Sequence, residues 1–236
     1  MTADWLPGVH TAPNIQGDPA IYEIENRAID PEGSILAAMA RVAPWQGRIV
    51  LDLGAGTGFY IPVFHDAAQH VFAVEPHGPS RRLAMSRVAS LGLDRASVMT
   101  GSAERILLPD DSVDVVHARF AYFWGPGCEP GLAEVDRVLR PGGSVVIIDN
   151  DLDEGTFADW LARAPGSRDQ ATIRAFWRDQ GFLSERIPSC WRFRTRADLE
   201  AVVRLEFREL AEELLREHRG VEVDYTYRLY HRDKAH

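Results

Sequence analysis

A glycine-rich segment, Gly54-Ala55-Gly56-Thr57-Gly58, directly follows a short apolar run that ends in Asp52-Leu53. Glycine permits a tight turn and lets a ligand approach the backbone closely. Where such a turn leads from a strand into a helix, the free N–H groups at the start of the helix face the ligand. A carboxylate or a phosphate would suit these donors equally. By itself the segment therefore predicts only a nucleotide-like ligand.

The spacing of the glycines distinguishes two classes of such ligands. The dinucleotide fingerprint has the pattern Gly-x-Gly-x-x-Gly, and its last glycine allows close packing of helix on strand. Counted from Gly54, the sixth position is Phe59, and counted from Gly56 it is Ile61. The third glycine comes one residue early, at Gly58. This pattern disfavours an NAD(P)-dependent oxidoreductase, which stays open as an alternative.

An acidic residue, Glu75, ends the next apolar run and precedes Pro76. A carboxylate about 20 residues beyond the glycine loop is placed to accept hydrogen bonds from both hydroxyls of a ribose. The alternative is an ordinary surface glutamate at the end of a strand. Because Glu75 lies between an apolar strand and a proline, we expect it to bind a ribose.

Four motifs in the same order resemble those of the class I (Rossmann-like) S-adenosylmethionine-dependent methyltransferases of the small-molecule type. Together they span residues 48–149, and the C-terminal third resembles the family only in general shape, as its variable, substrate-facing part. The resemblance implies an enzyme that binds S-adenosylmethionine as its cofactor. The motifs are Val50 to Gly58, Ala73-Val74-Glu75-Pro76, Gly101-Ser102-Ala103-Glu104 with Leu108 to Asp114, and Leu139-Arg140-Pro141-Gly142-Gly143.

The resemblance also implies which residues would hold the methionine portion of the cofactor. The loop backbone at Gly54, Ala55 and Gly56 would contact it. Asp52 would order this loop or contact the amino group. Arg119 lies where the backbone of the family often receives the methionine ammonium.

A second set of residues would hold the nucleoside portion by the same resemblance. Glu75 would bind the ribose hydroxyls, and Pro76 would lie against the adenine. The segment Ser102, Ala103 and Glu104 would border the adenine.

The acceptor side carries weaker signals. His117, near the end of the predicted fourth strand, is the candidate general base, because open α/β sheets bind ligands at that edge. The alternative is a packed or solvated histidine. Four aromatic residues could form a wall over the acceptor, although ordinary core packing explains them equally well. They are Tyr22, Tyr122, Phe123 and Trp124.

The segment Asp149-Asn150-Asp151 resembles part of a metal site. Its first two residues correspond to two of the metal ligands of the catechol-type O-methyltransferases. The third ligand would be an aspartate about where Arg119 stands, and a cation there opposes a bound divalent ion. We therefore expect no metal, and we expect Asp149-Asn150-Asp151 to be an acceptor-site or loop-capping feature in which Asn150 contacts the acceptor.

Alternating strand and helix patterns predict an α/β fold with helices on both faces of the sheet. We expect a Rossmann-like, doubly wound, seven-stranded and mostly parallel sheet, with a reversed C-terminal strand over residues 221–230 and a helical cap. Residues 1–45 would form an N-terminal arm and cap helices. Residues 46–236 would form the S-adenosylmethionine-binding domain, with residues 151–182 as a lid over the acceptor site.

Helix signals set further boundaries. Asp18-Pro19 is typical of an N-cap followed by proline at the first helical position. A second helix would begin at Pro31, and Gly181 would cap another. Other predicted helices cover residues 80–91, 130–139, 156–164, 168–180 and most of 196–219; other predicted strands cover 49–53, 71–75, 97–100, 113–117, 144–149 and 187–193.

Composition excludes several classes of partner. The chain has 236 residues and a formal net charge of −9, and an acidic surface repels a phosphate backbone, so we expect no nucleic acid. Its 2 cysteines provide neither a disulfide framework nor a zinc site. Without a signal peptide or an apolar run of about 18 residues, no membrane association is expected. We expect a cytoplasmic monomer or homodimer.

These observations predict transfer of a methyl group from S-adenosylmethionine to a small-molecule acceptor, mainly by positioning and without a metal. Besides the oxidoreductase, a non-catalytic S-adenosylmethionine-binding module remains open, because methyl transfer needs no obligatory catalytic side chain. The sequence leaves open the identity of the acceptor and the choice among O, N, C and S as the methylated atom.

Overall fold

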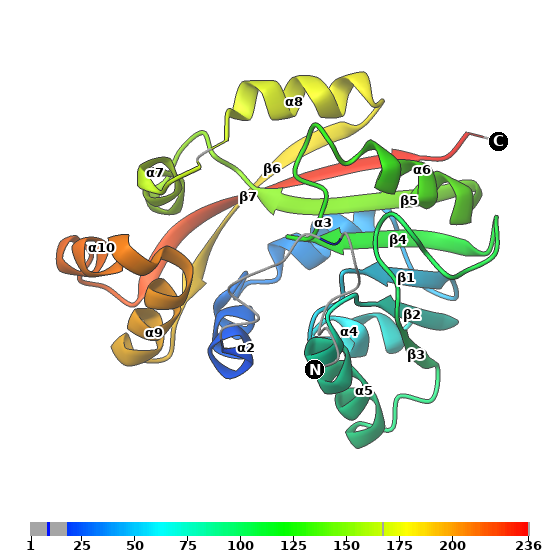
Figure 1. The fold of residues 1–236 in the computed structure, drawn as a ribbon, viewed down its shortest axis with the longest axis horizontal. Coiled ribbons are helices and arrows are strands. Elements are labelled where there is room, and N and C mark those ends of the chain that lie inside the picture. Colours follow the sequence, from blue (N-terminus) through cyan, green and yellow to red (C-terminus); the bar gives the residue numbers. More distant parts are fainter. Residues whose placement is uncertain (1–8, 10–17, 167, 236) are drawn as a thin grey trace.

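The computed structural model describes residue 9 and residues 18–166 and 168–235. Its centre is one seven-stranded sheet (Figure 1). The strand order is β3-β2-β1-β4-β5-β7-β6. All neighbours pair in parallel except β7, which runs antiparallel to both β5 and β6. The predicted Rossmann-like sheet with a reversed C-terminal strand is therefore confirmed. The strands are β1 (Ile49–Leu53), β2 (His70–Val74), β3 (Ala96–Met99), β4 (Val113–Arg119), β5 (Leu139–Asn150), β6 (Leu183–Arg192) and β7 (Glu222–Asp233).

The central strands are buried on both faces, which explains their continuous apolar runs. In β5, Val145 and Ile147 belong to the core on one face, and Val146 and Ile148 belong to the core on the other. This alternation follows from the two-residue period of a strand.

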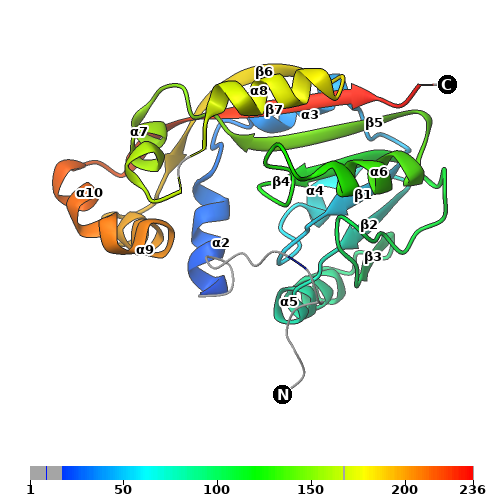
Figure 2. The same ribbon diagram turned by 45° about the horizontal axis from the view of Figure 1, so that its top comes forward.

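Helices cover both faces of this sheet (Figure 2). One face packs against α3 (Ser34–Val42), α4 (Ile61–His65) and α5 (Gly78–Ser90). The other packs against α6 (Glu129–Val138) and α8 (Gln170–Asp179). No helix in the described part of the chain is long and apolar enough to cross a membrane.

The remaining helices gather beyond the carboxyl ends of the central parallel strands (Figure 1). The first of them begins as predicted, because the Asp18 side chain accepts hydrogen bonds from the N–H groups of Ala20 and Ile21. These helices, called the cap below, are α2 (Pro19–Ala28), α7 (Thr156–Arg163), α9 (Arg196–Phe207), the short 3₁₀ helix η1 (Arg208–Leu210) and α10 (Ala211–Glu217). Most of the predicted N-terminal arm lies outside the described residues.

Several element boundaries differ from the sequence prediction; strand β5, for example, begins at Leu139 rather than Ser144. Helix α3 begins at Ser34 rather than Pro31, because the Asp30 carboxylate accepts hydrogen bonds from the N–H groups of Ser34 and Ile35. Strand β6 begins four residues before the predicted Ile187, since it pairs with β7 along its whole length although its side chains show little apolar alternation. The predicted helix over 196–219 is interrupted at Arg208, where φ is 44°.

Candidate active site

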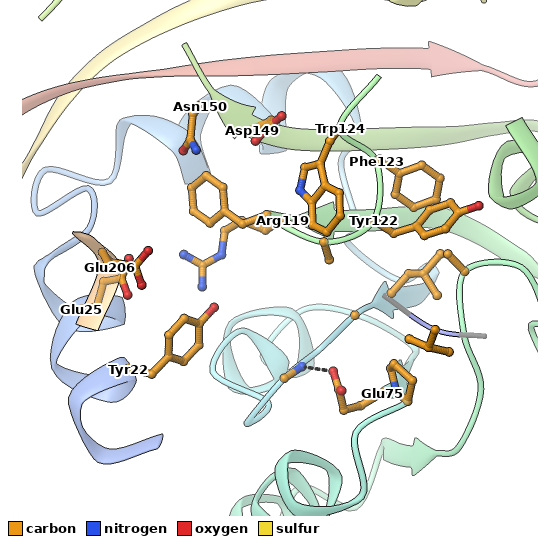
Figure 3. Close-up of a pocket in the computed structure, with 18 of the residues that line it drawn as sticks. Tyr22, Glu25, Glu75, Arg119, Tyr122, Phe123, Trp124, Asp149, Asn150 and Glu206 are labelled. Atoms are coloured by element: carbon orange, nitrogen blue, oxygen red, sulfur yellow. Dashed lines mark hydrogen bonds between the residues drawn. The ribbon is translucent and has the colours of Figure 1, made fainter. Parts of the chain in front are cut away.

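A cavity of about 370 Å³ lies where the loops after β1 and β4 meet the cap (Figure 3). The strand order reverses between these two strands, and open α/β sheets bind ligands at such a switch point. Its volume falls within the range of small-molecule sites. The residues predicted from the sequence that line it are Tyr22, Gly54, Gly56, Glu75, Pro76, Ser102, Ala103, Glu104, Arg119, Tyr122, Phe123, Trp124 and Asn150.

The glycine loop forms the floor of the cavity. The N–H groups of Gly54 and Ala55 both donate to the carbonyl oxygen of Val74, at 2.9 and 3.1 Å, which ties the loop to the end of β2. Gly54 has a φ of +78°, and a Cβ there would lie 2.5 Å from the Cβ of Ala121. Only glycine allows this backbone conformation and this close approach of the two loops.

Glu75 is held rigidly at the edge of this floor. Its carboxylate accepts a hydrogen bond from the N–H of Gly56 at 2.8 Å, drawn as a dashed line in Figure 3, and another from the N–H of His77 at 2.7 Å. Each carboxylate oxygen keeps further acceptor capacity. Burial raises the pKa of Glu75, and the two N–H donors partly oppose this effect. The carboxylate is thus fixed in place and can still accept hydrogen bonds from a ligand.

The loop after β4 forms the opposite wall. Phe120 and Tyr122 have φ values of 51° and 59°, an unusual conformation for residues other than glycine that is often found at functional sites. The Tyr122 hydroxyl donates to the Glu104 carboxylate at 2.7 Å, which links this wall to the segment after β3. A Cβ at Gly131 would lie 2.3 Å from the Tyr122 ring, so α6 leaves room for the ring only because it has glycine there.

Three sequence-predicted residues, Asp52, Ala55 and His117, line a smaller pocket of about 20 Å³ instead of the main cavity. Asp52 and His117 are register partners on β1 and β4, and their side chains form a hydrogen bond of 2.9 Å. His117 is 1% exposed and stacks on the ring of Tyr60. His117 therefore lines the smaller pocket, and its role as a general base stays a prediction.

Arg119 links the two pockets, since it lines both. Its guanidinium lies 4.5 Å from the centre of the Tyr60 ring and donates to the side-chain oxygen of Asn26. Its Nη1 atom is buried and has no hydrogen-bond partner among the described residues. The family resemblance implies that the backbone at Arg119 contacts the methionine ammonium. The structure also places the positively charged side chain of Arg119 in the cavity lining.

Several cavity residues were not predicted from the sequence. Most of them come from the helices beyond the strand ends and from the loop after β4. The set comprises Val9, Glu25, Leu53, Phe120, Ala121, Phe157, Leu161, Arg168, Leu205, Glu206, Arg208 and Tyr225. Asp149, from the segment singled out above, also lines the cavity; it is 3% exposed and lies 3.3 Å from the guanidinium of Arg168.

Two of these residues, Glu25 of α2 and Glu206 of α9, form a carboxyl pair on the cap side of the cavity (Figure 3). Their side chains share a hydrogen bond, and Glu25 is 7% exposed. Burial and the neighbouring Glu206 raise the pKa of Glu25 well above its usual range, while Arg119 opposes the shift. No pattern within either helix indicates this pair.

The raised pKa of Glu25 predicts a stability change that depends on pH. Above its ordinary pKa of 4.5, the unfolded chain has lost this proton while the folded chain still holds it, so stability falls as pH rises. Glutamine cannot ionise, so Glu25→Gln is expected to be more stable than the wild type at pH 8, on the order of 1 kcal/mol, with the difference shrinking as the pH approaches 4.5. Urea unfolding at several pH values measures this.

The matched control for this measurement is Glu209→Gln, because Glu209 is exposed on η1 and does not line the cavity. It removes the same charge and should leave the pH profile of stability unchanged. An equal stabilisation by both variants would mean that overall charge, and not the buried pair, is responsible.

No metal-binding cluster is found within the described residues: none of their His, Cys, Asp and Glu side chains form a group of three or more that could hold an ion. At the end of β5, Asp149 faces Arg168, and the side chain of Asn150 accepts a hydrogen bond from the hydroxyl of Tyr225.

The predicted lid region divides into two parts. Residues of and after α7 face the cavity through Phe157, Leu161 and Arg168. Helix α8 instead packs on the sheet, where Ile173 and Trp177 are buried.

Comparison with known proteins places the glycine loop and Glu75 inside a recognised domain. Residues 50–143 match the family model described as a methyltransferase domain. An uncharacterized methyltransferase of Mycobacterium tuberculosis is 39% identical over 135 residues, which are 56% of this chain and 50% of that protein. Malonyl-acyl-carrier protein O-methyltransferase of Methylococcus capsulatus is 31% identical over 126 residues, which are 53% of this chain and 45% of that protein. The chain thus spans about half the length of these curated relatives.

Solved structures are similar over more of the chain. The crystal structure of the YcgJ protein from Bacillus subtilis superposes with a TM-score of 0.64 and 20% sequence identity. The match covers 87% of this chain and 99% of that one. At this identity the likeness concerns the fold.

Proposed function

We propose that this chain, which belongs to the class I S-adenosylmethionine-dependent methyltransferases, transfers a methyl group from that cofactor to a small molecule bound under the cap. S-adenosylmethionine is the methyl donor of this family. The observation that carries the proposal is the Glu75 carboxylate, held by two backbone N–H groups beside the glycine loop and facing the cavity.

The residues present suit this cofactor. Glu75 would accept hydrogen bonds from the ribose hydroxyls, and Ser102 and Ala103 line the same side of the cavity, where the adenine would lie. At the other end, Gly54 and Gly56 line the cavity, where the loop backbone would contact the methionine portion. The buried, unpartnered Nη1 of Arg119 is a donor suited to a carboxylate there.

When bound, the cofactor supplies an activated methyl group, so the protein has mainly to orient the acceptor. Positioning by the surrounding side chains can contribute several kcal/mol. Phe157 and Tyr225 are buried, and their rings stack with 3.8 Å between the ring centres. They would help to exclude water from the acceptor side. We assign the Asp52–His117 pair to ordering the glycine loop from below, because it is buried between β1 and β4.

The acceptor would lie between α2, α7 and α9, whose residues line the cavity opposite Glu75. We extend the lid proposal to these helices: α7 would cover the acceptor together with α2 and α9, while α8 stays on the sheet. A cavity of about 370 Å³ suits a small molecule better than a macromolecular segment.

Calorimetry with S-adenosylmethionine and with NAD tests the choice of cofactor. We expect binding of the first and no heat with the second, because the glycine loop lacks the dinucleotide spacing. Clear binding of NAD without binding of S-adenosylmethionine would overturn the proposal.

A second measurement separates an enzyme from a non-catalytic binding module. A fractionated metabolite extract is added to the protein with S-adenosylmethionine, and S-adenosylhomocysteine is measured. We expect its formation with some fraction. A protein that binds the cofactor but forms no S-adenosylhomocysteine with any fraction would favour the binding module.

A further inference from the structure

The carboxyl pair of Glu25 and Glu206 has no role in holding the cofactor as proposed above. It lies on the cap wall, across the cavity from Glu75 (Figure 3). The two carboxyl groups share a hydrogen bond, and the second oxygen of Glu25, Oε2, is buried without a hydrogen-bond partner among the described residues. A buried acceptor atom that lines a cavity and lacks a partner carries a free-energy cost that a ligand donor can remove.

Among the described residues, Arg119 is the cation that faces Glu25. Its guanidinium donates to Asn26 and lies over the ring of Tyr60. Arg168 and Arg208 also line the cavity. These cations offset the charge of the pair, so what the pair offers a ligand is a set of hydrogen-bond acceptors, including the unpartnered Oε2 of Glu25.

Aromatic rings complete this wall. Tyr22, Phe120, Phe157 and Tyr225 line the cavity with the pair. The faces of aromatic rings attract cations, and this attraction strengthens where water is excluded. Carboxylates combined with aromatic rings favour a positively charged ligand over a neutral or negative one.

We propose that the Glu25–Glu206 pair recognises a primary or secondary amine of the acceptor molecule, bound as its ammonium ion. This inference rests on the function proposed above and names the class of its acceptor. A primary ammonium has three N–H donors, enough for both carboxyl groups, including the unpartnered Oε2 of Glu25. A hydroxyl has one donor, and a carboxylate has none.

Binding of the ammonium displaces the proton that the pair holds. The pKa of Glu25 is raised by burial and by Glu206, so the pair retains a proton at pH values where an exposed glutamate has lost it. The other groups that interact with Glu25 are Arg119, Tyr22, Tyr225 and Tyr227; the pKa of each tyrosine is raised by burial, so these hydroxyls stay neutral. Amine binding should therefore release a proton and strengthen as pH rises above 4.5, the ordinary pKa of a glutamate, as long as the amine stays charged.

The test is calorimetry on the full chain saturated with S-adenosylhomocysteine, so that no turnover occurs. The probes are 2-phenylethylamine, the uncharged 2-phenylethanol of similar shape, and phenylacetate. We expect the amine to bind roughly tenfold or more tightly than the alcohol, and phenylacetate not to bind. Measurements in two buffers of different ionisation enthalpy should show proton release with the amine alone.

Two variants each remove one carboxyl group of the pair, and a third serves as a control. Glu25→Gln and Glu206→Gln should each reduce the preference for the amine to about threefold or less and abolish proton release. Glu209→Gln removes one negative charge from a nearby exposed residue. It should retain both the preference for the amine and the release of a proton. Binding of S-adenosylhomocysteine to each variant verifies that it is folded.

Two outcomes would overturn the inference: equal or tighter binding of the alcohol or phenylacetate by the wild type, or an amine preference that both pair variants retain. Failure of the proposed function would appear separately, because the protein would then not bind S-adenosylmethionine or S-adenosylhomocysteine.

Discussion

Replacing Gly54 with alanine is expected to abolish most of the cofactor affinity and to destabilise the fold. The φ of +78° at this residue costs alanine roughly 1–2 kcal/mol. In addition, the new Cβ would lie 2.5 Å from the Cβ of Ala121, well inside van der Waals contact. Overpacking of this kind adds roughly 1–3 kcal/mol. Because the two loops must separate to relieve it, we expect about a 100-fold or greater loss of S-adenosylmethionine affinity.

Urea unfolding and calorimetry on the same samples measure both effects of Gly54→Ala. Gly47→Ala is the control, because Gly47 has a φ of +67° but a methyl group added there would have no other atom within 4 Å. Gly47→Ala has the free-energy cost of a positive φ without a steric clash, and Gly47 does not line the cavity. If both variants lost the same stability and both kept normal cofactor affinity, the close approach of Gly54 and Ala121 would not matter.

Replacing Glu75 with alanine is expected to weaken binding of S-adenosylmethionine by roughly 1–3 kcal/mol, or about 5- to 150-fold. The variant removes the acceptors for the ribose hydroxyls. It also leaves the N–H groups of Gly56 and His77 without the partner that fixes the loop, at 2.8 and 2.7 Å. Calorimetry with S-adenosylmethionine measures the loss.

Glu75→Gln separates these two contributions. Its amide keeps one oxygen acceptor but replaces the other with a donor, so we expect an intermediate loss. Glu129→Gln, at the exposed start of α6 and away from the cavity, is the control for the change in charge. Wild-type affinity in Glu75→Ala would remove this carboxylate from the cofactor site.

The sequence could predict the residues around Glu75 that line the cavity, because each of them belongs to a short segment of contiguous residues. The glycine loop, the Ala73-Val74-Glu75-Pro76 motif and the Ser102-Ala103-Glu104 segment each follow one strand. Parallel strands bring their carboxyl ends to the same edge of a sheet, so predicting the strands also places these loops together. Local pattern was therefore sufficient to anticipate the lining of this part of the cavity.

The surroundings of His117 depend on strand register, which local pattern does not give. Its place near the end of a strand suggested access to the acceptor, but side chains on a strand alternate between faces. Its register opposite Asp52 puts both side chains on the same face, beneath the glycine loop, against Tyr60 and Phe64. The pairing of β1 with β4, and not the sequence of either strand, decides this.

From the sequence alone follow the parallel sheet, its reversed last strand and the loops after the parallel strands that line the cavity, because periodicity and turn residues act over short stretches of chain. The tertiary structure alone decides the cap side of the cavity. Glu25 and Glu206 stand on helices from opposite ends of the chain, and only the packing of α2 on α9 brings their carboxyl groups together. Nothing within either helix indicates its partner, since such a contact is set by how the cap folds onto the sheet.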